Sequence, residues 1–170
     1  MKKVLIAIAF TTLLWNYSEA QDKASTNPNV FSLGLEASLP IGTFGDFYSF
    51  GIGGSVQIEH KISQQTGLTL NIGYISYSVK SSLGSGHTAF IPVLAGVKQY
   101  FSPSIYGHAQ LGASFGSGSG GGTYFTYSPG IGFVISKNID ALVKFVGISG
   151  GSGGGSLNSI AVRLAYNFGQ

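Results

Sequence analysis

The chain has 170 residues, of which 44% are hydrophobic and only 9% are charged, and its formal net charge is +3. This length suits a single domain, and so few charges are unusual for a water-soluble domain, where roughly a quarter of the residues are charged. The basic residues are scattered, without the clusters or interleaved aromatics that nucleic-acid binding needs, and the chain has no cysteine from which to build a disulfide framework. We therefore expect no nucleic-acid partner.

Residues 1–20 have the pattern of a secretory signal peptide. Two lysines precede an apolar run, 4–15, that is shorter than the ~20 residues a membrane-spanning helix needs. Small residues then occupy the positions that a signal peptidase reads. We expect cleavage after Ala20 and an exported chain with a flexible leader over 21–29.

The remaining residues, 30–170, predict one domain of β-strands. Apolar and polar residues alternate with a period of two, which is typical of strands whose faces lie in different environments. In the third strand the phase slips near Ile75, which predicts a β-bulge or the exit from a membrane. The eight predicted strands cover 30–39, 51–61, 67–79, 89–101, 105–116, 123–136, 139–148 and 157–168.

The connections between these strands alternate in length. Those after the second, fourth and sixth strands are short, and the others are longer and rich in Gly and Ser. Short turns on one side and long loops on the other are typical of outer-membrane barrels, whose short turns and termini lie in the periplasm. An even number of antiparallel hairpins also leaves no open sheet edge in lipid. The predicted fold class is therefore all-β, an eight-stranded antiparallel up-and-down transmembrane β-barrel.

Charge indicates which face of the strands points outward. The apolar face carries no Asp, Glu, Lys or Arg, and only His60, near a strand end, is titratable. Such a band suits hydrocarbon, where a Lys or Arg at the midplane costs roughly 2–4 kcal/mol. The polar face has too few charges to solvate a water-facing surface, namely Glu36, Glu59, Lys98, Asp140, Lys144 and Arg163. We expect the apolar face outside, in lipid.

The interior of an eight-stranded barrel is just wide enough for its own side chains to fill, so its charges must pair. Glu36 and Arg163 lie at similar depth on the first and last strands, which become neighbours when the sheet closes, and we predict an ion pair between them. This network favours a structural plug over an ion path. The residues expected to extend it are Gln57, Asn71, Lys98, Gln110 and Lys144.

Several motifs match catalytic or cofactor-binding patterns only formally. The G-x-G-x-x-G match at 116–121 precedes a strand, so no helix N-terminus follows to hold a pyrophosphate. The G-x-S-x-G matches at 112–116 and 147–151 lack the strand-to-helix elbow of a nucleophile. The histidines are too dispersed for a metal site, with His108 expected inside the barrel, and nothing in the spacing requires His87 to form an active site. We expect no enzyme activity, cofactor or metal.

The first long connection, 40–50, is the one loop with aromatic side chains. They form either part of an interfacial girdle, which we favour, or a contact surface for a partner. The four residues are Phe44, Phe47, Tyr48 and Phe50.

The mature chain resembles the small outer-membrane β-barrel proteins of the Bacteroidetes type, which are akin in size to the OmpX and OmpA barrels. The residues that carry the resemblance are 39–45 (LPIGTFG), 91–98 (IPVLAGVK), 129–132 (PGIG) and 163–168 (RLAYNF). The family has no common catalytic residues. Its barrel-assembly machinery is thought to read a terminal strand that ends in an aromatic residue, a signal displaced here by the two residues after Phe168.

Together these features predict a monomeric barrel in the outer membrane of a Gram-negative bacterium, with both termini in the periplasm. Its expected role is structural or one of surface interaction. Its expected partners are outer-membrane lipid, the assembly machinery and an extracellular partner at the long loops. Two alternatives are a narrow channel for small solutes or ions and an exported soluble barrel that binds an apolar ligand.

Overall fold

The computed structural model describes residues 29–117, 121–149 and 156–168. The predicted signal peptide, most of the leader, the last two residues and parts of the Gly/Ser-rich connections at 117–122 and 149–156 lie outside the described residues. No helix in the described ranges combines the length and the apolarity needed to cross a membrane.

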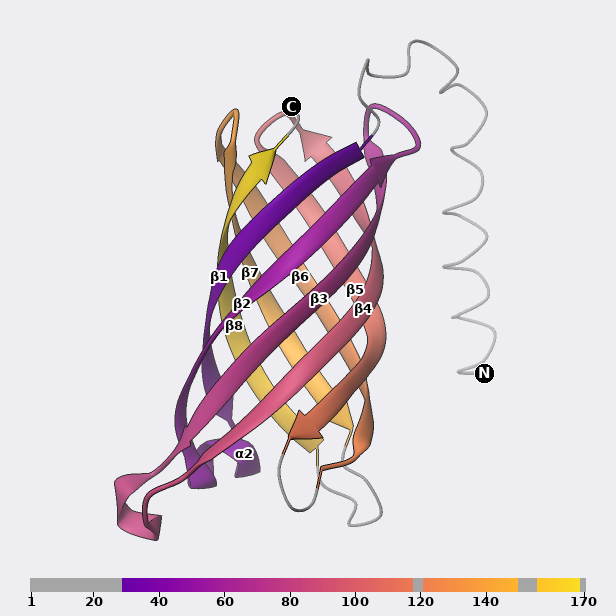
Figure 1. Ribbon diagram of the computed structural model, residues 1–170. Coiled ribbons are helices and arrows are strands. Elements are labelled where there is room, and N and C mark those ends of the chain that lie inside the picture. The colour runs from indigo at the N-terminus through magenta and orange to yellow at the C-terminus, as the bar shows by residue number, and fades with distance from the viewer. Residues whose placement is uncertain (1–28, 118–120, 150–155, 169–170) are drawn as a thin grey trace, which may run out of the picture.

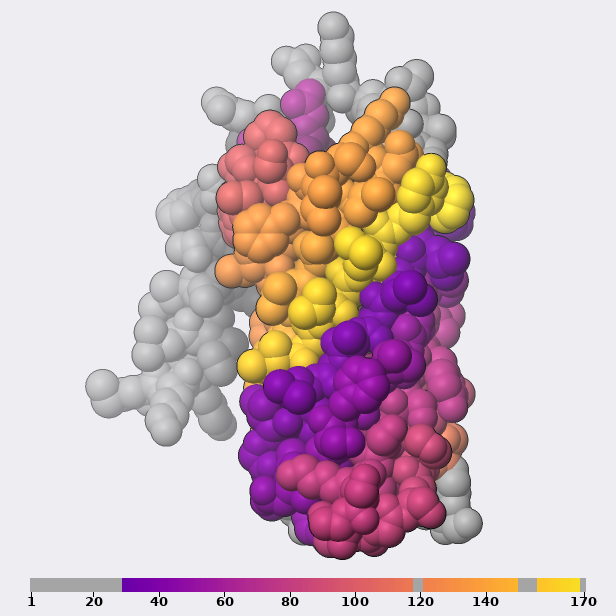
Figure 2. Space-filling model, turned by 90° about the vertical axis from the view of Figure 1, so that its left-hand side faces the viewer, coloured from indigo at the N-terminus to yellow at the C-terminus, as the bar shows by residue number. Residues whose placement is uncertain are grey.

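Eight antiparallel strands close into one barrel in the order of the sequence, which confirms the predicted fold class (Figure 1). The first and last strands pair along a seam that runs from Phe31 opposite Phe168 to Ile41 opposite Asn158. In Figure 2 this seam runs obliquely across the face of the molecule, with yellow β8 beside indigo β1. The strands are β1 (Asn29–Ile41), β2 (Tyr48–Lys61), β3 (Thr66–Val79), β4 (His87–Ser102), β5 (Ile105–Ser117), β6 (Thr123–Ser136), β7 (Ile139–Ser149) and β8 (Ser156–Phe168).

The two ends of the barrel differ as the connection lengths predict. β1 begins and β8 ends at the upper end in Figure 1, together with the short connections after β2, β4 and β6. We call this the turn end. The opposite loop end carries two short helices, α2 (Thr43–Phe47) and the 3-10 helix η2 (Ser81–Leu83).

Almost every strand residue lies on the face that alternation predicts. In β3 the alternation continues past Ile75, where the sequence predicted a change of phase. Gly53 pairs with Ile75 and Gly51 with Tyr77 in one unbroken register, and the irregularity of this strand pair lies at the start of β2. Ile75 and Tyr77 are buried and point inward. The predicted bulge near Ile75 is therefore wrong, because the inner wall itself changes from polar to apolar towards the loop end.

The outward positions of the strands form a continuous apolar face. Leu35 is 74% exposed and Leu111 is 61% exposed. Neither these positions nor any other outward position of the described strands holds an Asp, Glu, Lys or Arg.

Candidate functional site: the barrel interior

The seven residues predicted for the interior all lie at inward positions. Glu36 is largely buried, and the other six have at most 6% of their surface exposed. They come from seven of the eight strands, so closure of the sheet is what brings them near one another. Their individual contacts differ.

The predicted neighbours Glu36 and Arg163 are directly paired across the seam. Arg163 Nε lies 3.8 Å from Glu36 Oε1, but a closer cation is Lys144, whose Nζ is 2.9 Å from Glu36 Oε2. Ser55 stands between the seam pair, because its hydroxyl donates to Glu36 at 2.6 Å and accepts from Arg163 Nε at 2.8 Å. Arg163 also donates to Ser32 at 3.0 Å. We call Glu36, Lys144 and Arg163 the seam cluster.

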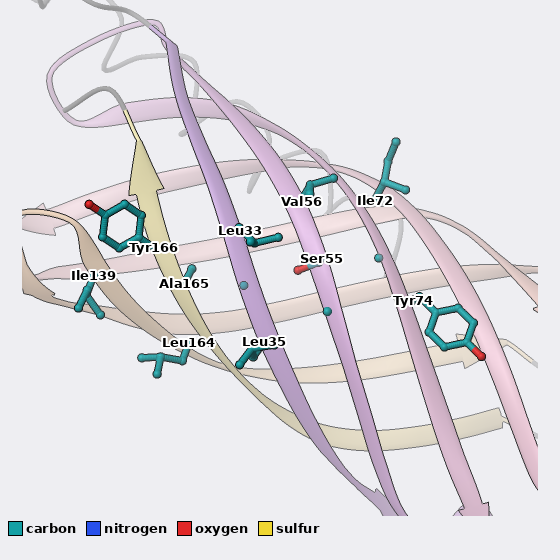
Figure 3. A pocket seen from close by; sticks show the side chains of 13 residues that line it. Leu33, Leu35, Ser55, Val56, Ile72, Tyr74, Ile139, Leu164, Ala165 and Tyr166 are labelled. Atoms are coloured by element: carbon teal, nitrogen blue, oxygen red, sulfur yellow. The ribbon is translucent and has the colours of Figure 1, made fainter.

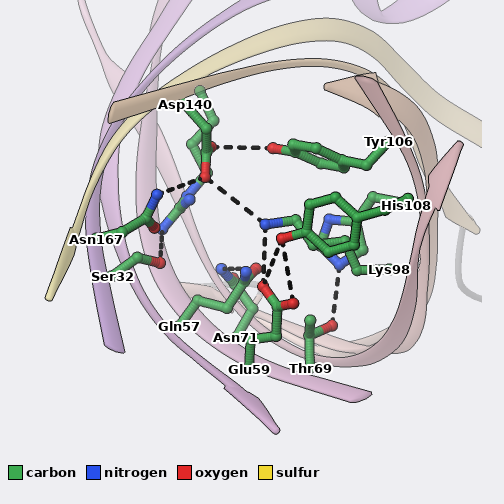
Figure 4. Close-up of polar contacts among 12 residues, drawn as sticks. Ser32, Gln57, Glu59, Thr69, Asn71, Lys98, Tyr106, His108, Asp140 and Asn167 are labelled. Carbon is green, nitrogen blue, oxygen red and sulfur yellow. Dashed lines mark hydrogen bonds and ion pairs between the residues drawn. The ribbon is translucent and has the colours of Figure 1, made fainter. Parts of the chain in front are cut away.

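A second group of ions lies nearer the turn end, shown in Figure 4. Lys98 Nζ is 3.0 Å from a carboxylate oxygen of Glu59 and 3.6 Å from one of Asp140. We call Glu59, Lys98 and Asp140 the turn-end cluster. Two tyrosines complete its surroundings, since Tyr100 donates to Glu59 at 3.2 Å and Tyr106 donates to Asp140 at 2.9 Å. The Lys98 ammonium also lies 4.1 Å from the Tyr106 ring centroid, within the range of a cation–π contact.

The two clusters balance in charge. The seam cluster has one carboxylate and two cations, and the turn-end cluster has two carboxylates and one cation. Burial of an ion is tolerated when partners compensate it, and these six side chains compensate one another. Glu59 and Asp140 were recognised as polar-face residues but not as members of the network. The predicted network contained three cations and only one anion, Glu36. This imbalance of charge could have indicated that Glu59 and Asp140 belong to it.

The neutral members of the predicted network make fewer contacts. Asn71 donates to Gln57 at 3.4 Å, and His108, which lies inside as expected, contacts Thr69 through Nε2 at 2.9 Å. Gln110 is buried, but its amide nitrogen has no hydrogen-bond partner among the described residues. Gln110 is therefore inside without joining the others.

A glycine at Gly34 makes room for the seam cluster. A Cβ added there would lie 2.5 Å from Arg163 Nε. Gly54, which points outward from the next strand, has only the Gly34 carbonyl oxygen near it, at 3.4 Å from such a Cβ. The Arg163 side chain thus leaves no room for a side chain at Gly34, whereas nothing excludes one at Gly54.

Apolar side chains fill the loop end of the interior. Phe44 of α2 is 2% exposed, and its ring centroid lies 4.8 Å from that of Tyr48 and 4.9 Å from that of Tyr77. We call the whole group the loop-end plug; it consists of Phe44, Tyr48, Ile75, Tyr77, Phe90, Tyr124, Val146, Ile148 and Leu157.

The four aromatic residues expected to form a girdle or contact surface do not share one environment. Phe47 and Phe50 are exposed, as either role requires. Phe44 is instead buried in the plug, so the expectation is wrong for Phe44, whereas Tyr48 packs within the plug but is only partly buried. The reason is α2, which turns Phe44 back over the barrel mouth.

A groove of about 630 Å³ crosses the outer face of β8, β1, β2 and β3 (Figure 3). It lies where Gly54 leaves a gap among outward side chains. The groove is part of the apolar outer face, whereas the inner wall carries ions. Its larger lining side chains are Leu33, Leu35, Val56, Ile72, Tyr74, Leu164 and Tyr166, together with Ile139 of β7.

The described ranges contain no evident metal site. No group of three or more His, Cys, Asp or Glu side chains there is arranged to hold a metal ion. The acidic and basic side chains of the interior are bound to one another, not aimed at a cleft.

No protein-family model matches the chain, and no curated protein matches its sequence. Solved structures do match its fold. The N-terminal β-barrel domain of OprF from Pseudomonas aeruginosa has a TM-score of 0.59 and 13% identity, over 82% of this chain and 97% of that domain. Ail, the attachment invasion locus protein of Yersinia pestis, has a TM-score of 0.58 and 16% identity, over 82% of this chain and 97% of that one.

The fold is that of small eight-stranded transmembrane barrels. A de novo designed transmembrane β-barrel also matches, with a TM-score of 0.52 and 16% identity over 85% of this chain and 99% of the design. Because natural and designed proteins share the fold, the fold alone assigns no task. Membership of the Bacteroidetes type stays a prediction from the sequence motifs.

Proposed function

We propose that the protein is an outer-membrane β-barrel of a Gram-negative bacterium with an interior closed to solutes, acting as a structural or surface-interaction protein. The observation that carries the proposal is that the same strands present an uncharged apolar face outward and paired ions inward. In water the outer face would expose apolar area far beyond that of a typical monomer. In lipid both faces have suitable surroundings.

Aromatic side chains at both ends of the outer face support a membrane-spanning position. Outer-membrane barrels carry girdles of aromatic residues at both interfaces, with an apolar band about 25 Å tall between them. Here the girdle towards the turn end consists of Phe31, Phe101, Phe133, Tyr166 and Phe168, and that towards the loop end of Phe50, Tyr74, Phe115, Phe125 and Tyr127.

The packing of the interior supports a plug over a channel. Along the axis, a solute would have to pass the turn-end cluster, the seam cluster and the loop-end plug in turn. Each ion in these clusters is held by an opposite charge within 4 Å. Separating such buried partners costs several kcal/mol. The proposed role therefore involves no transport, enzyme activity or cofactor.

The proposed orientation follows from the connections. Short turns face the periplasm in barrels of this kind, so the turn end and both termini are placed there and α2 and η2 at the cell surface. Phe47 and Leu83 are more than half exposed at the loop end and offer apolar contact to an extracellular partner. The terminal strand, which ends in Phe168, is the segment proposed to meet the assembly machinery.

Cell fractionation tests the location. The full-length chain should be recovered in the outer-membrane fraction, and the extracted protein should migrate differently on a gel before and after heating, as closed membrane barrels do. Recovery in the periplasm without detergent would contradict the proposal and favour the soluble barrel with an apolar ligand.

Conductance of the purified protein in planar bilayers tests the closed interior. Bilayers that contain the inserted protein should stay electrically silent, because no continuous water path crosses the packed clusters. Stable single-channel steps would contradict the plug and favour the narrow channel. Insertion itself is checked by the heat-dependent migration of protein in the vesicles that are fused with the bilayer.

A further inference from the structure

Two polar atoms of the inner wall are buried without a partner. They are Gln110 Nε2 on β5 and Ser128 Oγ on β6, and neither has a hydrogen-bond partner among the described residues. Gln110 is 4% exposed and Ser128 is 1% exposed, so bulk water does not satisfy them. Buried polar groups in native proteins nearly always bind something, which makes this pair a candidate binding site.

The two residues lie directly opposite each other in the sheet. Gln110 pairs with Ser128 in the register of β5 with β6, so both side chains leave the same face at neighbouring positions. Nearby groups do not compete for them, because Thr126 donates to Ser114 at 2.7 Å and His108 contacts Thr69 at 2.9 Å. The unpartnered atoms are therefore free to share one small ligand.

Charge and hydrogen-bonding chemistry select the ligand. The amide nitrogen only donates, whereas the hydroxyl both donates and accepts, so the ligand must accept from one and can exchange a hydrogen bond with the other. An additional ion would upset the balance of three carboxylates and three cations in the two clusters. A neutral molecule that donates and accepts and fits a packed interior is water.

We propose that one buried water molecule bridges Gln110 Nε2 and Ser128 Oγ. It accepts a hydrogen bond from the amide and binds the hydroxyl, and it completes the polar wall of β5 and β6. This inference rests on the proposed closed interior, because a water trapped between the loop-end plug and the turn-end cluster leaves only when the barrel opens locally. The interior is thus hydrated at one point but not open.

NMR of the full chain in phospholipid nanodiscs tests the water bridge. The side-chain amide protons of Gln110 should show a nuclear Overhauser effect with water. The sign of this effect should be that of a long-lived bound water molecule, which differs from that of freely diffusing water. Ser128→Val replaces the hydroxyl by two methyl groups that cannot hydrogen-bond, and the signal should be lost. The matched control is Ser38→Val, at a buried serine of β1 whose hydroxyl already lies 3.1 Å from that of Tyr77, and there the Gln110 signal should persist.

The absence of a Gln110–water signal in the wild-type protein, or its persistence in Ser128→Val, would overturn the bridge. If Ser128→Val does not fold, a high-resolution crystal structure of the wild-type protein decides. Ordered water within about 3.2 Å of both atoms supports the bridge, and a direct amide–hydroxyl hydrogen bond refutes it. Silent bilayers without a water signal would reject the bridge alone, whereas a conducting bilayer would reject the closed interior.

Discussion

Two cations from different strands hold the Glu36 carboxylate. Lys144 on β7 is the nearer, and Arg163 on β8 acts both directly and through the Ser55 hydroxyl. Because the carboxylate is largely buried, it depends on these partners for the solvation that water would otherwise supply. The stability of the seam therefore depends on matched charges more than on any single contact.

The losses from replacing two members of the seam cluster should not add. Lys144→Met removes the nearer cation of Glu36, Glu36→Gln removes the anion shared by Lys144 and Arg163, and each should lower the free energy of unfolding by about 3–5 kcal/mol. The double variant keeps the interior as a whole neutral and should lose clearly less than the sum of the two. Denaturant unfolding in phospholipid vesicles measures all three. Additive losses would show that the two groups do not interact.

The glycines of β1 and β2 allow a matched comparison. Gly34→Ala places a methyl group against the Arg163 guanidinium and should lower the free energy of unfolding by about 1–3 kcal/mol through overpacking. Gly54→Ala, on the outer face, should have little effect or be slightly stabilising. Equal losses in the two variants would argue that strand propensity, not the guanidinium, explains the glycine at Gly34.

At this scale, the sequence predicts which face a residue occupies but not which partner it binds. Alternation and equal depth were enough to place Glu36 opposite Arg163. The closer contact with Lys144 was not foreseeable, because it spans β1 to β7 through the lumen and depends on side-chain conformations of a closed barrel. Charge counting alone would have added Glu59 and Asp140.

The short helix α2 determines the character of the loop end. It directs Phe44 into the barrel mouth, where the ring contacts Tyr48 and Tyr77, and leaves Phe47 outside. The plug is thus assembled from one loop and from the inward residues of several strands. Since the two polar clusters lie between it and the turn end and already fill the interior, the plug contributes to stability more than to closure.

Phe44→Ala should lower the free energy of unfolding by about 3–5 kcal/mol, because it leaves a cavity in a packed aromatic cluster. Phe47→Ala, three residues along the same helix, is the matched control and should change stability by less than about 0.5 kcal/mol. Both variants should remain silent in planar bilayers. A Phe44→Ala protein as stable as the wild type would show that the Phe44 ring does not stabilise the loop-end plug.

Element boundaries were predictable where alternation is strict, as in β1 and β8. The helix α2 was not, because five residues are too few to show a helical period and Phe44 reads as an ordinary loop aromatic. The apparent slip in β3 had a different origin. Apolar residues on both faces hide the alternation wherever the interior itself becomes apolar.

At the scale of the whole molecule, closure of the sheet turns eight two-faced strands into a barrel with an apolar exterior and neutralised ions inside. Strand number, connection lengths and closure follow from the sequence because the period of two persists through the chain. Alternation alone leaves the two faces interchangeable. The scarcity of charge decides between them, since it suits lipid outside and paired ions within.

A cysteine-accessibility scan along β8 tests the central claim most directly, and the natural chain has no cysteine to interfere. Single cysteines are placed outward at Ile160 and Val162 and inward at Ser159 and Ala161, with Asp46 of α2 as the exposed control. In vesicles, a water-soluble thiol reagent should label only the α2 site, because lipid protects one face of β8 and packing protects the other. Labelling of the outward positions would contradict membrane insertion, and labelling of the inward positions would contradict the closed interior.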